Sequence, residues 1–175
     1  DRHRTEYDPL LTCSRDLVDE LVTRTGMHAL ISELYSSTVI NILQKHGSET
    51  EPLNFGRGRP MDLFRSATSK VILAYLLPRQ IKRVYESNAA EPDLQRLGPT
   101  WKDFSKAMLT IRKQGYCVSA GELDPGKTGL AAPIFDEKQR VLGSITLVGR
   151  SERFKAFQES FLCKLVVDAA NELTA

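Results

Sequence analysis

Apolar residues at helical spacing and short β-rich runs follow one another along this chain, and they predict the order of its elements. A first helix is expected after Asp8, because Asp8 can cap it, Pro9 suits its first position and Gly26 can end it in a left-handed conformation. Its apolar face is formed by Leu10, Leu17, Val18, Leu21 and Val22. Residues 27–49 then predict two strands that turn at Ser36-Ser37, and residues 51–64 predict a turn between short extended pieces.

Three helices are expected in the middle of the chain. The first begins near Ser66 and closes at Pro78, which opens a second, short amphipathic helix. A polar connector, residues 88–99, leads to Thr100. Thr100 can cap the third helix, with Asp103 as its capping partner and Gly115 as the stop.

Strands are predicted again in the last third of the chain, at about residues 116–121, 130–135 and 141–148, followed by one helix from Ser151 nearly to the end. Strands and helices do not alternate strictly, so the fold class is α+β with a mostly antiparallel central sheet. The 175 residues, 41% hydrophobic and 26% charged, show no repeat or linker. They are typical of a single domain over residues 1–175.

Composition narrows the function. Cys13, Cys117 and Cys163 lie far apart with no metal-ligand spacing, which indicates a reducing compartment and neither a disulfide framework nor a metal site. The sequence has no apolar run long enough for a membrane span and no signal-peptide pattern, so a cytoplasmic protein without a membrane partner is expected. The net charge of +2 does not indicate a nucleic-acid binder, and the basic residues between 57 and 83 are interpreted mostly as a solvated face.

Catalytic patterns are missing as well. The sequence has no GxSxG, HExxH or P-loop motif, and His3, His28 and His46 stand alone. Cys117 lies on a predicted strand, where a cysteine is usually a small buried hydrophobe. We therefore expect no enzyme and no cofactor.

The start of the helix near residue 66 is a candidate anion site. Arg65 precedes Ser66, Ala67, Thr68 and Ser69, and the first turn of a helix offers backbone N–H groups without internal partners. A guanidinium beside such amides can hold a carboxylate. The alternative is that Ser66 only caps the helix while Arg65 pairs with Asp62 or solvent, and the sequence leaves both open.

Small residues also mark the strands near residues 129–144. Gly129, Ala131, Ala132, Gly143 and Ser144 are too small to fill a core by themselves. They either let another element pack very close or leave room for a ligand.

Two stretches, "MDLFRSATSKVILAYL" and "IRKQGYCVSAGELDPGKTGLAAPIFDEKQRVLGSITLVG", resemble the effector-binding domain of IclR-type bacterial transcription regulators. The resemblance covers nearly the whole chain. It implies a GAF-like fold, with helices on both faces of an antiparallel sheet and a small-molecule pocket beside the sheet. The small residues at 129–132 and 143–144 would then line or flank a cavity rather than contact a helix. Positions that match the family's pocket are Leu53, Ala67, Thr68, Ser119, Gly129, Thr146 and Val148.

The sequence departs from the family's common pattern at several of these positions. The family usually has an acid at Ser119, a cysteine at Gly129, a serine at Val148, an alanine at Arg65 and a glycine at Ser69. A larger and less polar cavity with an added cation is expected, which favours an aromatic or otherwise bulky carboxylate. Tyr116 is interpreted as core, and Glu122 as fixing the turn before Gly126.

The resemblance thus implies the ligand-sensing half of a regulator, acting through a homodimer or tetramer. Its effector-binding residues would be Leu53, Arg65, Ser66, Ala67, Thr68, Ser69, Ser119, Gly129, Thr146 and Val148. DNA would be bound only through an N-terminal winged helix-turn-helix, which this chain lacks because only seven residues precede Asp8. Two alternatives remain: a free-standing GAF-like enzyme of the methionine sulfoxide reductase kind, and a purely structural dimerisation module with a collapsed pocket.

Overall fold

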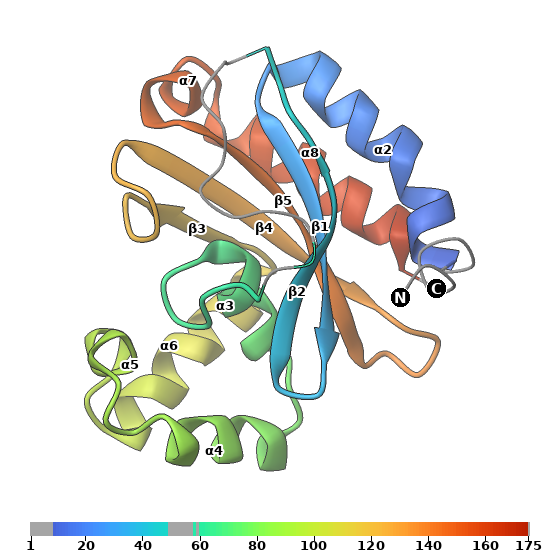
Figure 1. Ribbon diagram of the computed structural model, residues 1–175. Helices are drawn as coiled ribbons and strands as arrows, with labels where there is room; N and C mark the ends of the chain where they lie inside the picture. The colour runs from blue at the N-terminus through green and yellow to red at the C-terminus, as the bar shows by residue number, and fades with distance from the viewer. Residues whose placement is uncertain (1–8, 49–57, 59, 175) are drawn as a thin grey trace.

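A five-stranded antiparallel sheet with the strand order β2-β1-β5-β4-β3 forms the centre of the structure (Figure 1). This computed structural model describes residues 9–48, 58 and 60–174. The strands are β1 (His28–Tyr35), β2 (Thr38–Lys45), β3 (Cys117–Ala120), β4 (Lys127–Phe135) and β5 (Val141–Arg150). Because β5 pairs with both β1 and β4, the two ends of the chain contribute to one continuous sheet.

Helices cover both faces of this sheet. On one face lie α2 (Pro9–Thr25) and α8 (Glu159–Leu173), preceded by the short α7 (Ser151–Lys155). On the other lies α3 (Ala67–Leu73), with α4 (Pro78–Ser87), α5 (Pro92–Leu97) and α6 (Trp101–Gln114) beyond it (Figure 1). The α+β class and the antiparallel sheet with helices on both faces are confirmed.

Alternating side chains of the strands divide the core into two layers. Leu130, Ala132, Ile145 and Leu147 face α2 and α8, where they pack with residues such as Val166. On the opposite face, Ala131 packs with α3 in a cluster formed by Val39, Met61, Ala67, Val71, Ile72 and Cys117. A strand that alternates in this way is buried on both faces, as a central strand should be.

Several local signals act as the sequence predicts. Gly26 ends α2 with a φ of +74°, and Gly115 ends α6 with a φ of +86°. The Thr100 hydroxyl accepts a hydrogen bond from the Asp103 amide at 3.2 Å, which satisfies one of the unpartnered donors of the first turn of α6. Ser36, at the turn between β1 and β2, has a φ of +58°. The predicted cap Asp8 lies outside the described residues.

Two segments differ from the prediction. The polar connector contains α5, which begins at Pro92. Its Leu94 is only 1% exposed and, together with the partly buried Leu97, packs this helix against its neighbours. The last helix is interrupted after Ala156, and α8 begins at Glu159. Because Phe154, Phe157 and Phe161 keep helical spacing across this interruption, the sequence pattern predicts one continuous helix. Tertiary contacts fix α7 instead: its Arg153 donates to the Thr25 carbonyl at 3.0 Å.

The small residues on β4 and β5 serve strand pairing, contacts with α3 and the lining of a hollow. Gly143 allows close strand pairing, because a Cβ there would lie 2.0 Å from the Ser32 carbonyl oxygen. Ser144 donates a 2.9 Å hydrogen bond to the Thr68 carbonyl and so joins α3 to the sheet. Ala131 packs beneath α3, and Gly129 faces a hollow. The expectation that all of them flank a cavity rather than a helix is therefore corrected: Ala131 and Ser144 make helix contacts.

Candidate functional site

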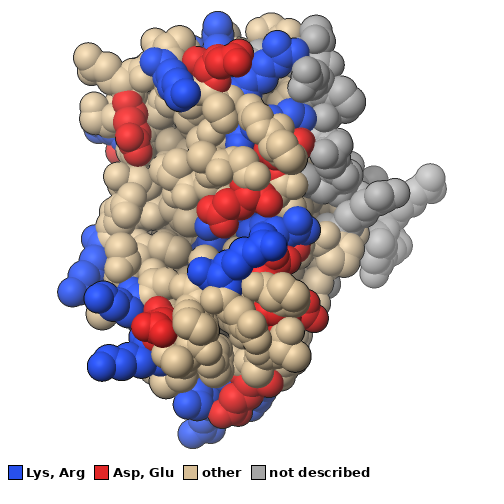
Figure 2. Space-filling model, turned by 90° about the vertical axis from the view of Figure 1, so that its left-hand side faces the viewer, with Lys and Arg blue, Asp and Glu red and all other residues tan. Residues whose placement is uncertain are grey.

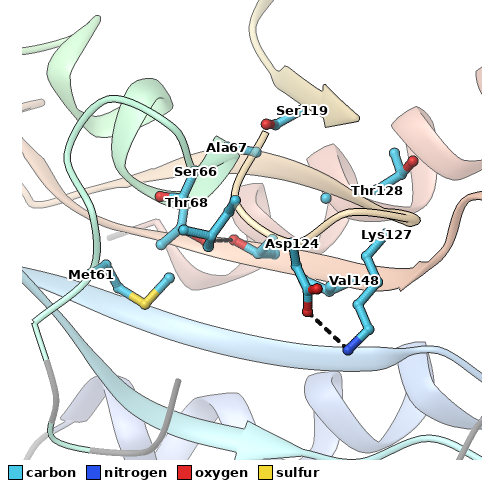
Figure 3. A pocket seen from close by; sticks show the side chains of 12 residues that line it. Met61, Ser66, Ala67, Thr68, Ser119, Asp124, Lys127, Thr128 and Val148 are labelled. Carbon is cyan, nitrogen blue, oxygen red and sulfur yellow. Dashed lines mark hydrogen bonds and ion pairs between the residues drawn. The ribbon is translucent and has the colours of Figure 1, made fainter. Parts of the chain in front are cut away.

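A hollow lies between the start of α3 and the ends of β3, β4 and β5 (Figure 3). Its lining residues come from five separate parts of the chain: Met61, Ser66, Ala67, Thr68, Ser119, Leu123, Asp124, Lys127, Thr128, Gly129, Thr146 and Val148. The centre of the hollow has a volume of about 30 Å³, and the whole hollow with its open mouth about 350 Å³. Since one water molecule needs roughly 10–15 Å³ of such central space, the centre holds about two waters.

The sheet places the strand residues of the site in one layer. Ser119 on β3 is the partner of Gly129 on β4, and Gly129 is the partner of Val148 on β5. A Cβ added to Gly129 would meet Ala67, Thr146 and Val148 side chains at 3.6, 3.8 and 3.9 Å, which are ordinary contacts. Gly129 therefore leaves the wall open where any larger residue would begin to fill the hollow.

Hydroxyl groups hold α3 against this wall. The Thr68 and Thr146 hydroxyls lie 2.7 Å apart, and both residues are almost fully buried. The Ser66 hydroxyl accepts from the Ser69 amide at 3.1 Å and donates to the Asp62 carbonyl at 3.0 Å. The lining of the hollow thus includes hydroxyl groups, but these already have partners.

The anion cradle predicted at this helix start is only partly present. The Ser69 amide is used by the Ser66 cap, which leaves the amides of Ala67 and Thr68 as the first-turn donors without an intrahelical acceptor. With seven residues, α3 is also too short for a strong helix dipole. Ser69 is buried but does not line the hollow.

Arg65 does not point into the hollow. Its guanidinium forms ion pairs with Asp62, at 3.1 Å, and with Asp93 of α5, at 3.3 Å, and its side chain is 39% exposed. The structure thus shows the pairing with Asp62 that the sequence left open as the alternative. What Arg65 contributes near the hollow is its main-chain carbonyl, which accepts a 2.9 Å hydrogen bond from the Ser119 hydroxyl.

The structure brings together seven of the ten residues expected to bind an effector: Ser66, Ala67, Thr68, Ser119, Gly129, Thr146 and Val148. Arg65 and Ser69 stay outside, and Leu53 lies outside the described residues. Sequence reasoning missed the other five lining residues: Met61, Leu123, Asp124, Lys127 and Thr128. The strand predicted at residues 130–135 in fact begins at Lys127. Because side chains two residues apart on a strand share a face, Lys127 lies on the same face as Gly129, and the later predicted start concealed this.

The loop between β3 and β4 closes one side of the hollow. Glu122 pairs with the Lys70 ammonium at 2.9 Å, and Lys70 on α3 is only 5% exposed. Glu122 therefore ties the loop to the helix. Asp124 pairs with Lys127 at 3.0 Å, and both side chains line the hollow (Figure 3).

Both described thiols, Cys117 and Cys163, are buried and have raised pKa values. Burial raises the pKa of the Cys117 thiol to about 11, against the weaker opposing effect of the Lys70 charge. Burial also raises the pKa of Cys163. Since the thiolate is the nucleophile, the raised pKa values lower the fraction of reactive thiolate in both groups at neutral pH. A sulfoxide reductase would require a cysteine in the pocket, and no cysteine among the described residues lines the hollow.

A larger hollow lies on the opposite face, between the edge strand β3 and the α7–α8 corner. Its central volume is about 580 Å³. The lining is mainly apolar and includes Val118, Ala120, Leu130, Phe154, Phe157 and Leu162. It has more space than the first hollow, so the test of function below distinguishes binding in one hollow from binding in the other.

Other functional classes find little support in the described part of the chain. Groups of three or more His, Cys, Asp or Glu side chains placed to hold a metal ion do not occur there. No helix in the same residues combines the length and apolarity needed to cross a bilayer. On the side where β3 forms the sheet edge, acidic and basic side chains are interspersed (Figure 2), which is not the pattern of a nucleic-acid interface.

Comparison with known proteins agrees with this architecture. The family described as "Bacterial transcriptional regulator IclR C-terminal" matches residues 5–175. The HTH-type transcriptional regulator BhcR of Paracoccus denitrificans is 28% identical over 94% of this chain and 59% of its own. The Pca operon regulatory protein of Acinetobacter baylyi is 24% identical over 91% of this chain and 59% of its own. The chain thus spans about three fifths of the length of these relatives.

Solved structures show the same fold. The Thermotoga maritima IclR structure has a TM-score of 0.86 at 20% identity, covering 98% of this chain and 69% of its own. The C-terminal domain of a putative transcriptional regulator from Vibrio cholerae has a TM-score of 0.81 at 24% identity, covering 96% of this chain and 98% of its own. With the family match over nearly every residue, the chain belongs to the IclR family of bacterial transcriptional regulators, of which it represents the C-terminal domain.

Proposed function

We propose that this domain senses a small carboxylate-bearing effector, aromatic or otherwise bulky, in the hollow beneath α3. The observation that carries the proposal is the convergence of α3, β3, β4 and β5 on Gly129, whose missing side chain leaves the wall of the hollow open. Few polar groups around a mostly apolar concavity are typical of small-molecule sites. The relatives are transcriptional regulators, which supports a sensing role rather than catalysis.

Effector binding would act by shifting the arrangement of a homodimer or tetramer. The central volume of about 30 Å³ is too small for an organic acid, so the hollow must widen when one binds. A ligand that binds the widened state better than the narrow one shifts the population toward it. A coupling of about 1–3 kcal/mol between hollow and assembly is enough for a switch. DNA would be bound by a further segment of the longer regulator.

The small central volume also supports a second candidate, a purely structural dimerisation module. A thermal-shift and calorimetric screen of aliphatic and aromatic carboxylates separates the two. For sensing, at least one acid should raise the melting temperature by about 5–10 °C at about 100 times its Kd. A dimerisation module would show no ligand-dependent shift.

Two filling variants locate the bound acid. Gly129→Leu should abolish the shift, because it fills the hollow beneath α3, whereas Gly129→Ala adds only ordinary contacts and should bind more weakly but measurably. Ala120→Leu, one position along β3 from Ser119, fills the larger hollow on the opposite face and should leave binding intact. If Ala120→Leu rather than Gly129→Leu removes the shift, the effector binds in the other hollow and this proposal is wrong.

A further inference from the structure

The hollow contains its own charge pair. Asp124 on the β3–β4 loop and Lys127 at the start of β4 both line it, with the Lys127 Nζ 3.0 Å from Asp124 Oδ2. Their side chains are only 17% and 10% exposed. In Figure 3 the two side chains point toward one another at the side of the hollow. A carboxylate already occupies the neighbourhood in which an acidic effector would have to bind.

This pair is close but imperfect. Asp124 Oδ2 is shielded from solvent and has no hydrogen bond among the described residues, although the ammonium is within ion-pairing distance. A buried carboxylate oxygen without a hydrogen bond is poorly stabilised. A carboxylate with better geometry can therefore replace it on Lys127.

The loop that carries Asp124 has a glycine at each end where the backbone can turn. Glycines with positive φ stand at both of its ends, Gly121 at +72° and Gly126 at +82°, and a Cβ at either would meet nothing within 4 Å. Between them, the Glu122–Lys70 pair holds the first part of the loop to α3. A change at the Gly126 end would have to break the 3.1 Å hydrogen bond from the Lys127 amide to the Asp124 carbonyl, and it would move Asp124 away from Lys127 while Glu122 stays in place.

The local charges favour an exchange over simple addition. A second carboxylate beside Asp124 would place two acids at one lysine, and like charges in a partly buried site oppose each other strongly. Lys127 still lines the hollow when Asp124 moves out. Arg65 cannot take this part, because Asp62 and Asp93 hold its guanidinium outside the hollow.

We propose that Asp124 is an internal stand-in for the carboxylate of the effector, and that Lys127 is the residue that selects acids over neutral ligands. The effector carboxylate takes the place of Asp124 on the Lys127 ammonium, and the released loop opens the hollow. This inference rests on the proposed sensing function and adds to it the charge partner and the displaced group.

Calorimetry with benzoate and benzamide tests the exchange, because the two probes share a shape and differ in charge. Lys127→Gln should weaken benzoate about 10-fold or more while changing benzamide by less than about 2-fold, since only benzoate loses a charged hydrogen bond. Asp124→Asn should strengthen benzoate several-fold, because the competing carboxylate is gone. Lys164→Gln and Asp168→Asn break a comparable exposed pair on α8 and should leave both probes unchanged.

The opposite outcomes are equally clear. If Asp124→Asn weakens benzoate or leaves it unchanged, if Lys127→Gln affects both probes alike, or if neither wild type nor Asp124→Asn binds benzoate, the exchange is wrong. Sensing itself still stands in those cases if any acid of the wider screen binds and Gly129→Leu abolishes its binding. Should a single variant fail to fold, the double variant Asp124→Asn with Lys127→Gln restores neutrality, and it should bind the two probes equally.

Discussion

At the scale of single residues, two glycines on neighbouring strands show how differently the absence of a side chain can be used. Gly129 faces the hollow, where a methyl group would meet neighbours at 3.6 Å or more. At Gly143 the same methyl group would lie 2.0 Å from the carbonyl oxygen of Ser32, inside the backbone of β1. The first glycine leaves the wall of the hollow open, and the second allows two strands to pair.

Alanine substitutions should separate these two roles. Gly143→Ala must push β1 and β5 apart, so we expect a loss of about 3 kcal/mol or more in the free energy of unfolding. Gly129→Ala should change it by less than about 1 kcal/mol. Urea unfolding followed by circular dichroism measures both, and equal losses would contradict the assignment of Gly143 to strand pairing.

Where a motif fixed both the position and the element, the structure brings the predicted residues together, although their role in binding an effector stays a prediction. Thr68, Gly129 and Thr146 lie around the hollow as the resemblance implied. Prediction was less successful for Arg65, because one of its two partners, Asp93, lies on a helix that the sequence did not predict. The position of the long Arg65 side chain depends on its charge partners, and one of them, Asp93, is 28 positions away in the sequence.

At the scale of elements, the sequence predicted what local chemistry controls. Caps and stops at Thr100, Gly115 and Gly26 set helix ends without help from the rest of the fold. The α5 helix and the break between α7 and α8 were missed, because short helices depend on tertiary packing more than on their own pattern.

Leu94 should therefore matter far more than a connector residue would. It is buried in the cluster that includes Val84, Phe104 and Met108. Leu94→Ala should lower the free energy of unfolding by about 2–4 kcal/mol through the cavity it creates. Its exposed neighbour offers a control: Gln95→Ala should change the same quantity by less than about 0.5 kcal/mol. Indistinguishable urea midpoints for the two variants would mean that α5 does not pack as described.

At the scale of the whole molecule, the buried thiols report how often the fold opens. Cys117 is 4% exposed between the sheet and α3, and Cys163 is 8% exposed on the opposite face of the sheet. Each can react only when its layer opens or the chain unfolds. The pair therefore measures the opening of both faces.

Iodoacetamide labelling followed by mass spectrometry should show this protection. In a Cys13→Ser background at pH 8, both thiols of the folded protein should react at least about 100-fold more slowly than in urea. The pKa of Cys117 is raised to about 11 from an ordinary 9.0, which also predicts how stability depends on pH. The contribution of Cys117 to the free energy of unfolding is complete below pH 9 and is lost as the pH rises toward 11. Rapid labelling of Cys117 at pH 8 would contradict its burial.

The two hollows are separated by the thickness of one strand. Thr128 of β4 belongs to the linings of both, and its hydroxyl lies 2.8 Å from that of Ser151 at the start of α7. A synthetic compound bound in the larger hollow, beside Phe154 and Phe157, would contact β4 on the face opposite to the hollow beneath α3. Under the proposed function, such a molecule would change the affinity of the hollow beneath α3 for its effector without occupying that hollow.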